Sequence, residues 1–347
     1  MLGALKKQAA VYYFNVYGLN VSSNREISWF KPAERFAKID WFIHFKTATN
    51  NEEAGNILID RLYYVSPYVD KENGKPDLEI ETDLNKQLYH FRFSDGVDVS
   101  IDNLNSQIIF QWPPAETLEY ELSYLTACIM SFVLLLRGTF SFHASAVGIN
   151  GKAVVLVGDS GSGKSTTIAA FAKLGYPVLS DDLVVLRDDL ETFWVQPAFP
   201  MIRLWEKSVV ALFGRADALP KIVPDRPLWN KQYLNLERDG YQFQDKELPL
   251  GGIYFLSSRS SDDFIPSIHP LSSQEALLSL VVNNYSASFI DKANRAKEFE
   301  MLGRILKTIP ARQVKQSNDI SHISYLCEAI LRDFDSINVC SSRSIHA

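Results

Sequence analysis

Nine consecutive residues from Gly158 to Thr166, GDSGSGKST, have the types and spacing of a phosphate-binding loop. They satisfy the pattern G-x-x-x-x-G-K-[ST] in full. In such a loop the glycines let backbone N–H groups turn toward phosphate oxygens, the lysine reaches the β- and γ-phosphates, and the next hydroxyl can hold Mg²⁺. We therefore predict a nucleotide site made of Gly158, Asp159, Ser160, Gly161, Ser162, Gly163, Lys164, Ser165 and Thr166.

Two adjacent acidic residues, Asp181 and Asp182, follow the loop at the end of an apolar run. A solvated turn or a helix cap would explain the triplet SDD structurally. Beside a bound nucleotide, a carboxylate can instead hold the metal ion or accept a proton from an attacking hydroxyl group. Because there are two acids, we expect them to divide these two tasks.

One histidine, His143, lies on the strand that comes just before the strand entering the loop. A hairpin signal at Asn150-Gly151 folds its strand back alongside the strand that enters the loop. A lone histidine on a strand is more often structural than functional. Its place beside the loop nevertheless makes it a candidate site residue, and the sequence leaves both interpretations open.

The elements that must position these groups are a strand, the loop, a helix and a second strand. The run AVVLV, residues 153–157, is almost wholly apolar, as in a strand buried on both faces. A helix is predicted from the loop to Gly175, since glycine commonly ends a helix. The next run, PVLSDDLVVL, predicts a strand pair or one strand with a bulge. This order is that of an α/β unit.

The first 112 residues predict a mostly antiparallel, partly solvated β-sheet. In YHFRFSDGVDVSI apolar positions alternate with polar ones around Asp95-Gly96, a pair typical of a tight hairpin turn. His44 and His90 have no acidic or cysteine partners at regular spacing, and we interpret them as structural. The prolines of WPPAE end this region, and a helix is expected over about residues 115–137.

Composition narrows the class of protein. The chain has 347 residues and a formal net charge of −6, which argues against a general nucleic-acid binder. Its three cysteines form no CxxC pair, so we expect reduced thiols and a cytoplasmic location. The most apolar run, residues 125–140, is interrupted by Arg137 well short of the ~20 residues that span a bilayer. We expect a buried core helix there, no signal peptide and no membrane partner.

Four stretches in this order, FHASAV, AVVLVGDSGSGKSTT, LGYPVLSDD and VVL, resemble the catalytic domain of bacterial HPr kinase/phosphorylases and their relatives. That domain carries a phosphate-binding loop on a fold akin to ATP-dependent phosphoenolpyruvate carboxykinase. The resemblance is firm for residues 141–186 and extends more weakly to about residue 335. The order of histidine strand, loop and double aspartate makes it more specific than the loop alone.

The resemblance implies a serine kinase that uses ATP and Mg²⁺. By that likeness the loop binds ATP, Lys164 steadies the transferring phosphoryl group, and Ser165 ligates the metal. Asp181 and Asp182 would supply the general base and the metal contact. We favour Asp181 as the base and Asp182 as the metal-side residue, while the spacing leaves this order open. His143 would approach the phosphates.

Several motifs depart from those of that family, and these departures concern which molecule accepts the phosphoryl group. Thr166 stands where HPr kinases usually have Glu. Where they carry a glycine-rich signature this chain has VQPAFPMIRLWEKS, in which only Arg203 corresponds, as a candidate phosphate contact. Recognition of HPr and the reverse phosphorolysis are therefore not expected. VYGLNV, PMIRLW and LPLGGIYFL instead resemble a divergent HPr-kinase-like group, which includes kinases of the C-terminal serine of lasso-peptide precursors.

We therefore expect an α/β protein, α+β overall, in three parts. These are a β-rich N-terminal region over residues 1–112, a P-loop catalytic domain of the HPr kinase type over residues 113–335, and a flexible tail over residues 336–347. The expected acceptor is a serine of a peptide or small protein. A small-molecule hydroxyl kinase and a non-catalytic ATP-binding regulator are the alternatives. The N-terminal region could bind the acceptor or form a subunit interface, and assembly as a homo-oligomer stays open.

Overall fold

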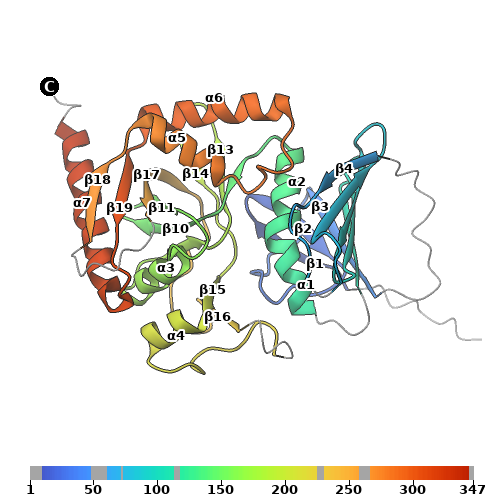
Figure 1. The fold of residues 1–347 in the computed structure, drawn as a ribbon, viewed down its shortest axis with the longest axis horizontal. Helices are drawn as coiled ribbons and strands as arrows, with labels where there is room; N and C mark the ends of the chain where they lie inside the picture. The colour runs from blue at the N-terminus through green and yellow to red at the C-terminus, as the bar shows by residue number, and fades with distance from the viewer. Residues whose placement is uncertain are drawn as a thin grey trace, which may run out of the picture. The chain divides into compact units, whose positions relative to one another are not determined.

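The structure, a computed structural model, describes residues 10–47, 61–71, 73–112, 118–224, 230–257 and 266–343 (Figure 1). The chain divides into two compact units between Leu122 and Ser123. This division lies later than the boundary expected after residue 112. The first helical residues belong with the N-terminal unit, where the hydroxyl group of Tyr120 donates a hydrogen bond to the carboxylate of Asp95.

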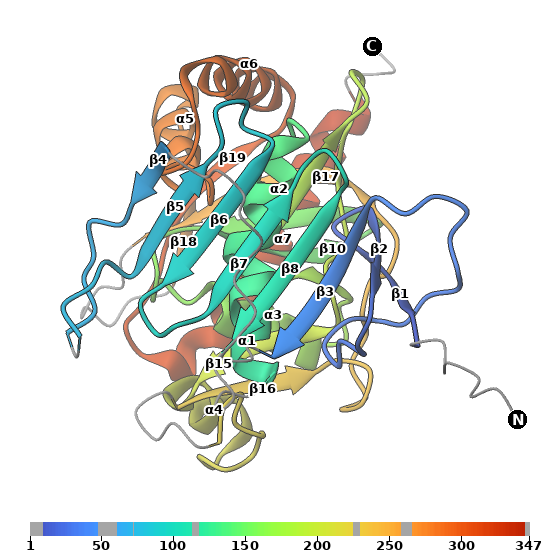
Figure 2. The ribbon, with the colours of Figure 1, turned by 90° about the vertical axis from the view of Figure 1, so that its right-hand side faces the viewer.

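The N-terminal unit is built on one eight-stranded sheet (Figure 2). Its strands are β1 (Tyr12–Val16), β2 (Leu19–Ser23), β3 (Trp41–Thr47), β4 (Arg61–Val65), β5 (Leu78–Thr82), β6 (Leu88–Phe93), β7 (Asp98–Asp102) and β8 (Gln107–Trp112). Their order across the sheet is β1-β2-β3-β8-β7-β6-β5-β4. The pairs β2–β3 and β3–β8 are parallel and the other pairs are antiparallel, so the sheet is mostly antiparallel.

Alternation of apolar and polar residues gives this sheet its buried face. In β6 the side chains of Tyr89 and Phe91 are buried, while Arg92 beside them is exposed. The turn at Asp95-Gly96 joins β6 to β7 in antiparallel register. The predicted hairpin is confirmed, because the period-two pattern and the turn residues agree with each other.

A helical segment follows as α1 (Leu118–Tyr124), a π-helical turn (Leu125–Ile129) and α2 (Met130–Leu136). Nearly all side chains of the turn and of α2 are buried, Leu125 and Phe132 among them. The core helix predicted for the most apolar run is confirmed, although residues 113–117, where its start was expected, lie outside the described residues. Among the residues that the structure describes, no helix combines the length and the apolar character that a membrane span needs.

The C-terminal unit is built on a nine-stranded mixed sheet. Its strands are β9 (Ser141–Phe142), β10 (Ala144–Ile149), β11 (Lys152–Val157), β12 (Val178–Ser180), β13 (Val184–Asp188), β14 (Phe193–Val195), β17 (Leu248–Leu256), β18 (Ser267–Pro270) and β19 (Ala311–Lys315). The main order is β12-β10-β11-β17-β14-β13-β9, with β19 beside β17 and β18 beside β19. The pairs β11–β17 and β17–β19 are parallel, and the other pairs are antiparallel.

Two predictions about this sheet can be compared with it directly. The turn at Asn150-Gly151 joins β10 to β11 as the predicted antiparallel hairpin. The run PVLSDDLVVL forms two strands rather than one bulged strand, because β12 pairs with β10 whereas β13 pairs with β9 and β14. The two aspartates lie at the break between β12 and β13, where the chain leaves one pairing partner for another.

Helices cover both faces of the sheet (Figure 1). They are α3 (Lys164–Lys173), α4 (Glu206–Phe213), α5 (Ser273–Val282), α6 (Lys292–Thr308) and α7 (Ile323–Arg343). On β11, Val154 packs in a cluster with Phe171 of α3 and Phe334 of α7. The next residue, Val155, packs in a second cluster with residues of α5 and α6, Leu302 among them. This alternation is what a strand buried on both faces requires, and it confirms the prediction for AVVLV.

A two-stranded antiparallel ribbon, β15 (Met201–Trp205) and β16 (Lys231–Asn235), belongs to the same unit. Ile202 and Leu204 of β15 are buried in the cluster that contains α3. Because side chains alternate along a strand, Arg203 between them points away from that cluster. The ribbon therefore presents one arginine toward the end of β12.

Helix α7 continues to Arg343, beyond the start of the flexible tail expected over residues 336–347, of which residues 344–347 lie outside the described residues. The apolar residues Cys327, Ile330 and Phe334 are buried at spacings of three and four residues, and Ile337, half-buried, continues the same stripe. An amphipathic stripe that reaches Ile337 extends the helix beyond the boundary that the polar composition predicted.

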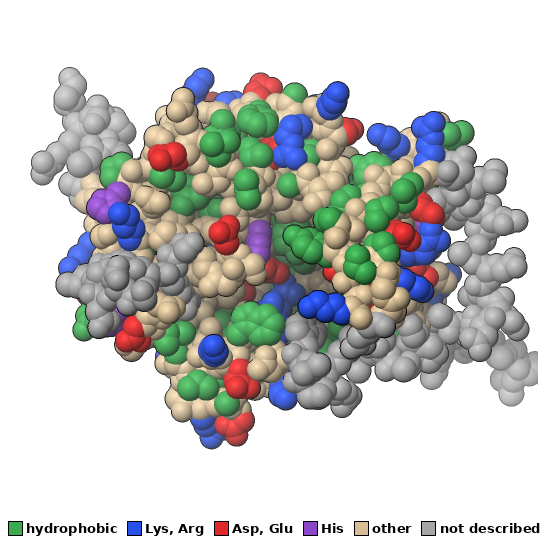
Figure 3. Space-filling view, in the orientation of Figure 1, with side chains coloured by type: hydrophobic (Ala, Val, Ile, Leu, Met, Phe, Trp, Pro, Cys, Tyr) green, Lys and Arg blue, Asp and Glu red, His purple; other side chains and the backbone are tan. Residues whose placement is uncertain are grey.

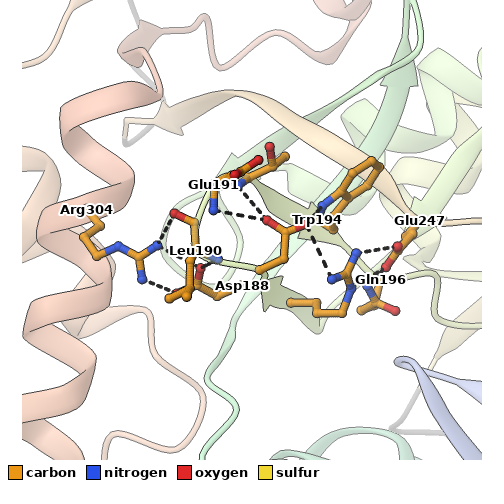
Figure 4. A network of polar contacts seen from close by, with 10 residues as sticks. Asp188, Leu190, Glu191, Trp194, Gln196, Glu247 and Arg304 are labelled. Atoms are coloured by element: carbon orange, nitrogen blue, oxygen red, sulfur yellow. Dashed lines mark hydrogen bonds and ion pairs between the residues drawn. The ribbon is translucent and has the colours of Figure 1, made fainter.

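A polar network away from the glycine loop fixes the β13–β14 hairpin (Figure 4). The guanidinium of Arg304, on α6, makes two hydrogen bonds to the carboxylate of Asp188 and one to the carbonyl oxygen of Leu190. On the other side, Arg187 makes a two-point contact with Glu247, just ahead of β17. These contacts join the hairpin to its neighbours and have a structural role.

Candidate active site

The direction of the strands brings the predicted site residues to one edge of the sheet. Strands β11 and β12 are both antiparallel to β10, so they point the same way and their carboxyl ends lie at the edge where β10 begins. The glycine loop follows β11, Asp181 and Asp182 follow β12, and His143 immediately precedes β10. Residues far apart in sequence therefore meet because of the topology alone.

The loop enters α3 through Gly163, whose φ of +104° lies in the left-handed region. This conformation favours glycine and turns the last loop amides toward the start of the helix. Gly158 has a different role, since a Cβ atom there would lie 2.8 Å from the carbonyl oxygen of Leu256 and 2.9 Å from Oγ of Ser162. The loop thus packs directly on the end of β17.

We expect Gly158→Ala to destabilise the protein by about 1–3 kcal/mol, as overpacking does, and to weaken nucleotide binding, because the loop must move away from Leu256. Thermal unfolding and an ATP titration measure the two effects. Gly303→Ala, within α6 and with nothing near its added Cβ, is the matched control and should be neutral or stabilising by about 0.5–1 kcal/mol. Equal behaviour of the two variants would contradict the packing argument.

Lys164, the first residue of α3, is buried beneath the loop. Its Nζ donates to the carbonyl oxygens of Gly158 at 2.6 Å and Asp159 at 3.1 Å. An ammonium group has three N–H donors, so these two bonds leave one for a ligand. Burial lowers the pKa of Lys164, and the nearby carboxylates, Asp182 foremost, oppose this shift.

Asp181 is buried and acts as an acceptor for groups of three elements. Its carboxylate accepts hydrogen bonds from Oγ of Ser145 on β10 at 2.8 Å and from the backbone N–H of Arg203 on β15 at 3.1 Å. The hydroxyl group of Ser165, in the loop, also hydrogen-bonds to it. Burial, and then the charge of Asp182, raise the pKa of Asp181 despite these hydrogen bonds.

The raised pKa of Asp181 leads to a stability prediction. An acid whose pKa is higher in the folded state than the ordinary ~3.9 destabilises the fold once the pH exceeds that ordinary value. We therefore expect Asp181→Asn to unfold at the same temperature as the wild type or higher at pH 7, with a smaller gain near pH 4. Thermal unfolding at the two pH values measures this. Asp182→Asn should instead lower the unfolding temperature at pH 7. A large loss of stability in Asp181→Asn would contradict a raised pKa of Asp181 in the folded state.

Asp182 takes a φ of +73°, which is unusual for a residue with a side chain, and its carboxylate lines an open cavity. One oxygen lies 3.2 Å from Nε2 of His143, and the other pairs with the guanidinium of Arg203. Burial alone would raise the pKa of Asp182, but Arg203 and then His143 outweigh it and hold the pKa far below its usual range. Asp182 is therefore ionised.

His143 is oriented from the side of the α5–α6 connection. Its backbone N–H donates to the carbonyl oxygen of Asn283 at 2.7 Å, and its ring meets the ring of Tyr285 edge to face with centroids 5.9 Å apart. The histidine thus contacts Asp182 from a position fixed by two elements. The sequence interpretation of a purely structural histidine does not account for this contact with a cavity-lining carboxylate.

The cavity, of about 850 Å³ and open to solvent, is lined by residues of the loop, of β15, β16 and α4, and by His143 and Asp182. The space-filling view shows histidine, acidic and basic side chains gathered in a hollow near the middle of the face drawn (Figure 3). Of the predicted site residues, those that line the cavity are His143, Ser160, Gly161, Gly163, Lys164, Ser165, Thr166, Asp182 and Arg203. Asp181 lies behind Asp182 and Ser165.

Sequence reasoning missed five residues that line the cavity, namely Leu204, Trp205, Lys207, Ser208 and Lys231. Nζ of Lys231 lies 5.1 Å from the centre of the Trp205 ring, as in a cation–π contact. Burial and the charge of Arg203 lower the pKa of Lys231, while Asp182 and Asp181 raise it. The basic residue Lys207 in WEKS was a signal available in the sequence, whereas Lys231 reaches the cavity only through the pairing of β16 with β15.

Thr166, where the resemblance leads one to expect Glu, is buried. Its Oγ1 lies 2.8 Å from Oγ of Ser208, in the first turn of α4. The residue therefore joins α3 to α4, and its small size leaves room in this part of the cavity.

The donor groups in the cavity suit a polyphosphate and a hard metal ion. Lys164, Arg203, Lys207 and Lys231 line it against the single carboxylate of Asp182, which gives an excess of positive charge. The oxygen atoms of Ser165, Asp181 and Asp182 are of the type that Mg²⁺ prefers in proteins. The residues present therefore fit ATP with Mg²⁺.

Comparison with known proteins finds HPr kinase/phosphorylases among the relatives of this chain. The HPr kinase/phosphorylase of Geobacillus thermodenitrificans (strain NG80-2) is 33% identical over 129 residues, which cover 33% of this chain and 42% of the relative. That of Streptococcus mutans serotype c (strain ATCC 700610 / UA159) is 37% identical over 109 residues, which cover 29% of this chain and 33% of the relative. The chain is therefore similar to HPr kinase/phosphorylases over about a third of its length.

The extent of the likeness is limited. The chain spans less than half the length of these curated relatives. No family model matches the chain. A structural likeness to the HPr(Ser) kinase/phosphatase from Coxiella burnetii covers 59% of this chain and 96% of that one, with 11% sequence identity and a TM-score of 0.33. Similarity at that level supports no statement about the fold.

Proposed function

We propose that this protein is an ATP-dependent serine kinase, with a P-loop core of the HPr kinase type in its C-terminal unit. The observation that supports this most is the convergence of the glycine loop, Lys164, His143, Asp182 and Arg203 on one cavity. A protein that only binds nucleotide has no need of an ionised carboxylate opposite the phosphate-binding lysine. The relatives named as kinase/phosphorylases agree with this activity.

The geometry leads us to propose the reverse of the acid assignment favoured from the sequence. Asp181 is buried next to the hydroxyl of Ser165, so these two residues would hold the Mg²⁺ ion on the inner side of the site. Asp182 faces the cavity beside His143, where an acceptor hydroxyl can reach it. Asp182 would therefore be the general base. The sequence spacing could not show which aspartate is the base, because the direction of each carboxylate depends on the turn at Asp182.

Phosphoryl transfer requires positioning and charge neutralisation more than covalent chemistry. The acceptor hydroxyl gives its proton to Asp182 as its oxygen bonds to the γ-phosphorus, and the bond from that phosphorus to the bridging oxygen of ADP breaks. Lys164 and Arg203 neutralise charge on the phosphoryl oxygens, and a Mg²⁺ ion held by Asp181 and Ser165 would supply further positive charge there. When an anionic phosphate shares Arg203, the hold of that guanidinium on Asp182 weakens, so Asp182 becomes a stronger base.

The acceptor we propose is a serine of a peptide, with the C-terminal serine of a lasso-peptide precursor as the narrowest candidate. This rests on the resemblance of VYGLNV, PMIRLW and LPLGGIYFL to peptide-linked proteins, and on Thr166 in place of Glu. Incubation with ATP and Mg²⁺ and a panel of acceptors tests it: peptides ending in serine, peptides with internal serine, free serine and sugars. Mass spectrometry should show phosphate on a peptide serine. Phosphate on free serine or a sugar would indicate a small-molecule kinase, and ATP binding without transfer would indicate a regulator.

A further inference from the structure

The strand order gives the bound nucleotide a direction. Strand β12, with the two aspartates at its end, lies on one side of β11, whereas β17 and β19 lie on the other side. Strands β11, β17 and β19 are parallel, so their carboxyl ends share an edge, the position at which open α/β sheets bind ligands. If the γ-phosphate lies by Asp182 and the phosphate chain follows the loop, the rest of the nucleotide extends toward the ends of β17 and β19.

A buried side chain links the loop to those ends. Gln316 immediately follows β19, and its Nε2 donates to the carbonyl oxygen of Ser162 in the loop at 2.7 Å and to that of Ser257, after β17, at 2.8 Å. Both amide hydrogens of Gln316 are therefore used for positioning. Gln316 also lines a cleft, so the same residue contacts the loop and forms part of the wall of that cleft.

The cleft beyond Gln316 is open to solvent, and its volume of about 270 Å³ includes that open space. Its lining is apolar with a few polar groups. Most of the residues that line the cleft lie just before or at the start of the C-terminal helical segment, namely Ser317, Asp319, Ile320, His322 and Leu326. Pro266, just before β18, also lines it. Nδ1 of His322 is buried without a hydrogen-bond partner among the described residues. A buried polar atom usually has a partner, so Nδ1 of His322 has a hydrogen-bonding capacity that the described residues leave unused. Apolar walls with a few acceptor groups suit a flat heterocycle that carries N–H donors.

We propose that this cleft holds the purine base of the phosphoryl donor, between Ile320 and His322 on one side and the Gln316 wall on the other. The proposal rests on the function proposed above, since it places the far end of the same nucleotide. In it, Nδ1 of His322 hydrogen-bonds to a polar edge of the base and the apolar residues cover its faces. The cleft therefore determines affinity for the nucleoside part of ATP, while the loop determines affinity for the phosphates.

Binding of ATP and of inorganic tripolyphosphate, each with Mg²⁺, separates these two contributions. Wild-type protein should bind ATP at least about tenfold more tightly than tripolyphosphate, since only ATP fills the cleft. His322→Ala should weaken ATP binding about five- to tenfold, the effect expected for one lost buried contact, and leave tripolyphosphate binding within about twofold. Ile320→Ala, which removes an apolar wall instead, should act in the same direction.

His269→Ala is the matched control, because His269 lies on β18, exposed and outside the cleft, and it should leave both affinities unchanged. Equal weakening of ATP and tripolyphosphate by His322→Ala would show that the residue supports the loop, and would overturn the proposal. So would unchanged ATP affinity in both cleft variants, or equal affinity of the wild type for the two ligands. These experiments measure binding and not transfer. If the protein binds ATP more tightly than tripolyphosphate in this way but transfers no phosphate, the proposal for the cleft stands and the proposed kinase activity is wrong.

Discussion

Asp182→Asn is expected to lower the rate of phosphoryl transfer by about 10²- to 10⁴-fold, the usual contribution of a general base. An amide cannot accept the proton of the attacking hydroxyl, and it leaves Arg203 without its carboxylate partner. The affinity for ATP should change much less, since the loop and Lys164 remain. Steady-state rates with the best peptide acceptor, combined with an ATP titration, measure the two effects separately.

The matched control is Asp188→Asn, a change of the same kind on β13, whose carboxylate pairs with Arg304 away from the cavity. It should keep wild-type transfer rates. If Asp182→Asn kept full activity while Asp181→Asn bound ATP but transferred no phosphate, Asp181 would be the general base, as the sequence favoured. The assignment of Asp182 as the base would then be wrong. If both lost activity, metal titration would separate them, because we expect only Asp181→Asn to require more Mg²⁺.

Lys164→Met is expected to reduce transfer by at least about 10²- to 10³-fold, as does loss of a donor aimed at developing negative charge. The methionine side chain fills a similar volume but cannot donate to Gly158, Asp159 or a phosphate. Unlike Asp182→Asn, this variant should also bind ATP much more weakly. The measurements are therefore kcat and the affinity for ATP, and both should fall in Lys164→Met, whereas mainly kcat should fall in Asp182→Asn.

Lys173→Met is the control for this change, because Lys173 ends the same helix and its ammonium group contacts the carbonyl oxygen of Leu212 and the Phe213 ring outside the cavity. It should retain both ATP binding and transfer. Wild-type ATP affinity in Lys164→Met would contradict a phosphate-binding role for the loop lysine, whatever its effect on the rate.

Local patterns were enough to predict the elements that hold the site. The hairpins at Asp95-Gly96 and Asn150-Gly151 follow from turn chemistry next to alternating strands. The strand AVVLV and the helix after the loop follow from hydrophobic pattern and from a loop sequence of known mechanics. In each case the information lies within a few residues of the element itself.

The remaining features depend on contacts between distant segments. Lys231 reaches the cavity because β16 pairs with β15, and Gln316 reaches Ser162 because β19 is parallel to β17. The orientation of the two aspartates depends on the positive φ of Asp182, which no neighbouring residue type signals. Sequence spacing could identify the acidic pair, but only the turn shows which carboxylate faces the cavity.

The central claim, that the γ-phosphoryl group of ATP moves to a serine hydroxyl, is tested most directly by following that group. ATP labelled at the γ-phosphorus is incubated with Mg²⁺, the wild-type protein and a peptide that ends in serine, and the label is located after separation. The account predicts label on the serine of the peptide with the wild type and only a trace with Asp182→Asn. Label found solely in inorganic phosphate, or remaining in ATP with every hydroxyl acceptor offered, would contradict it.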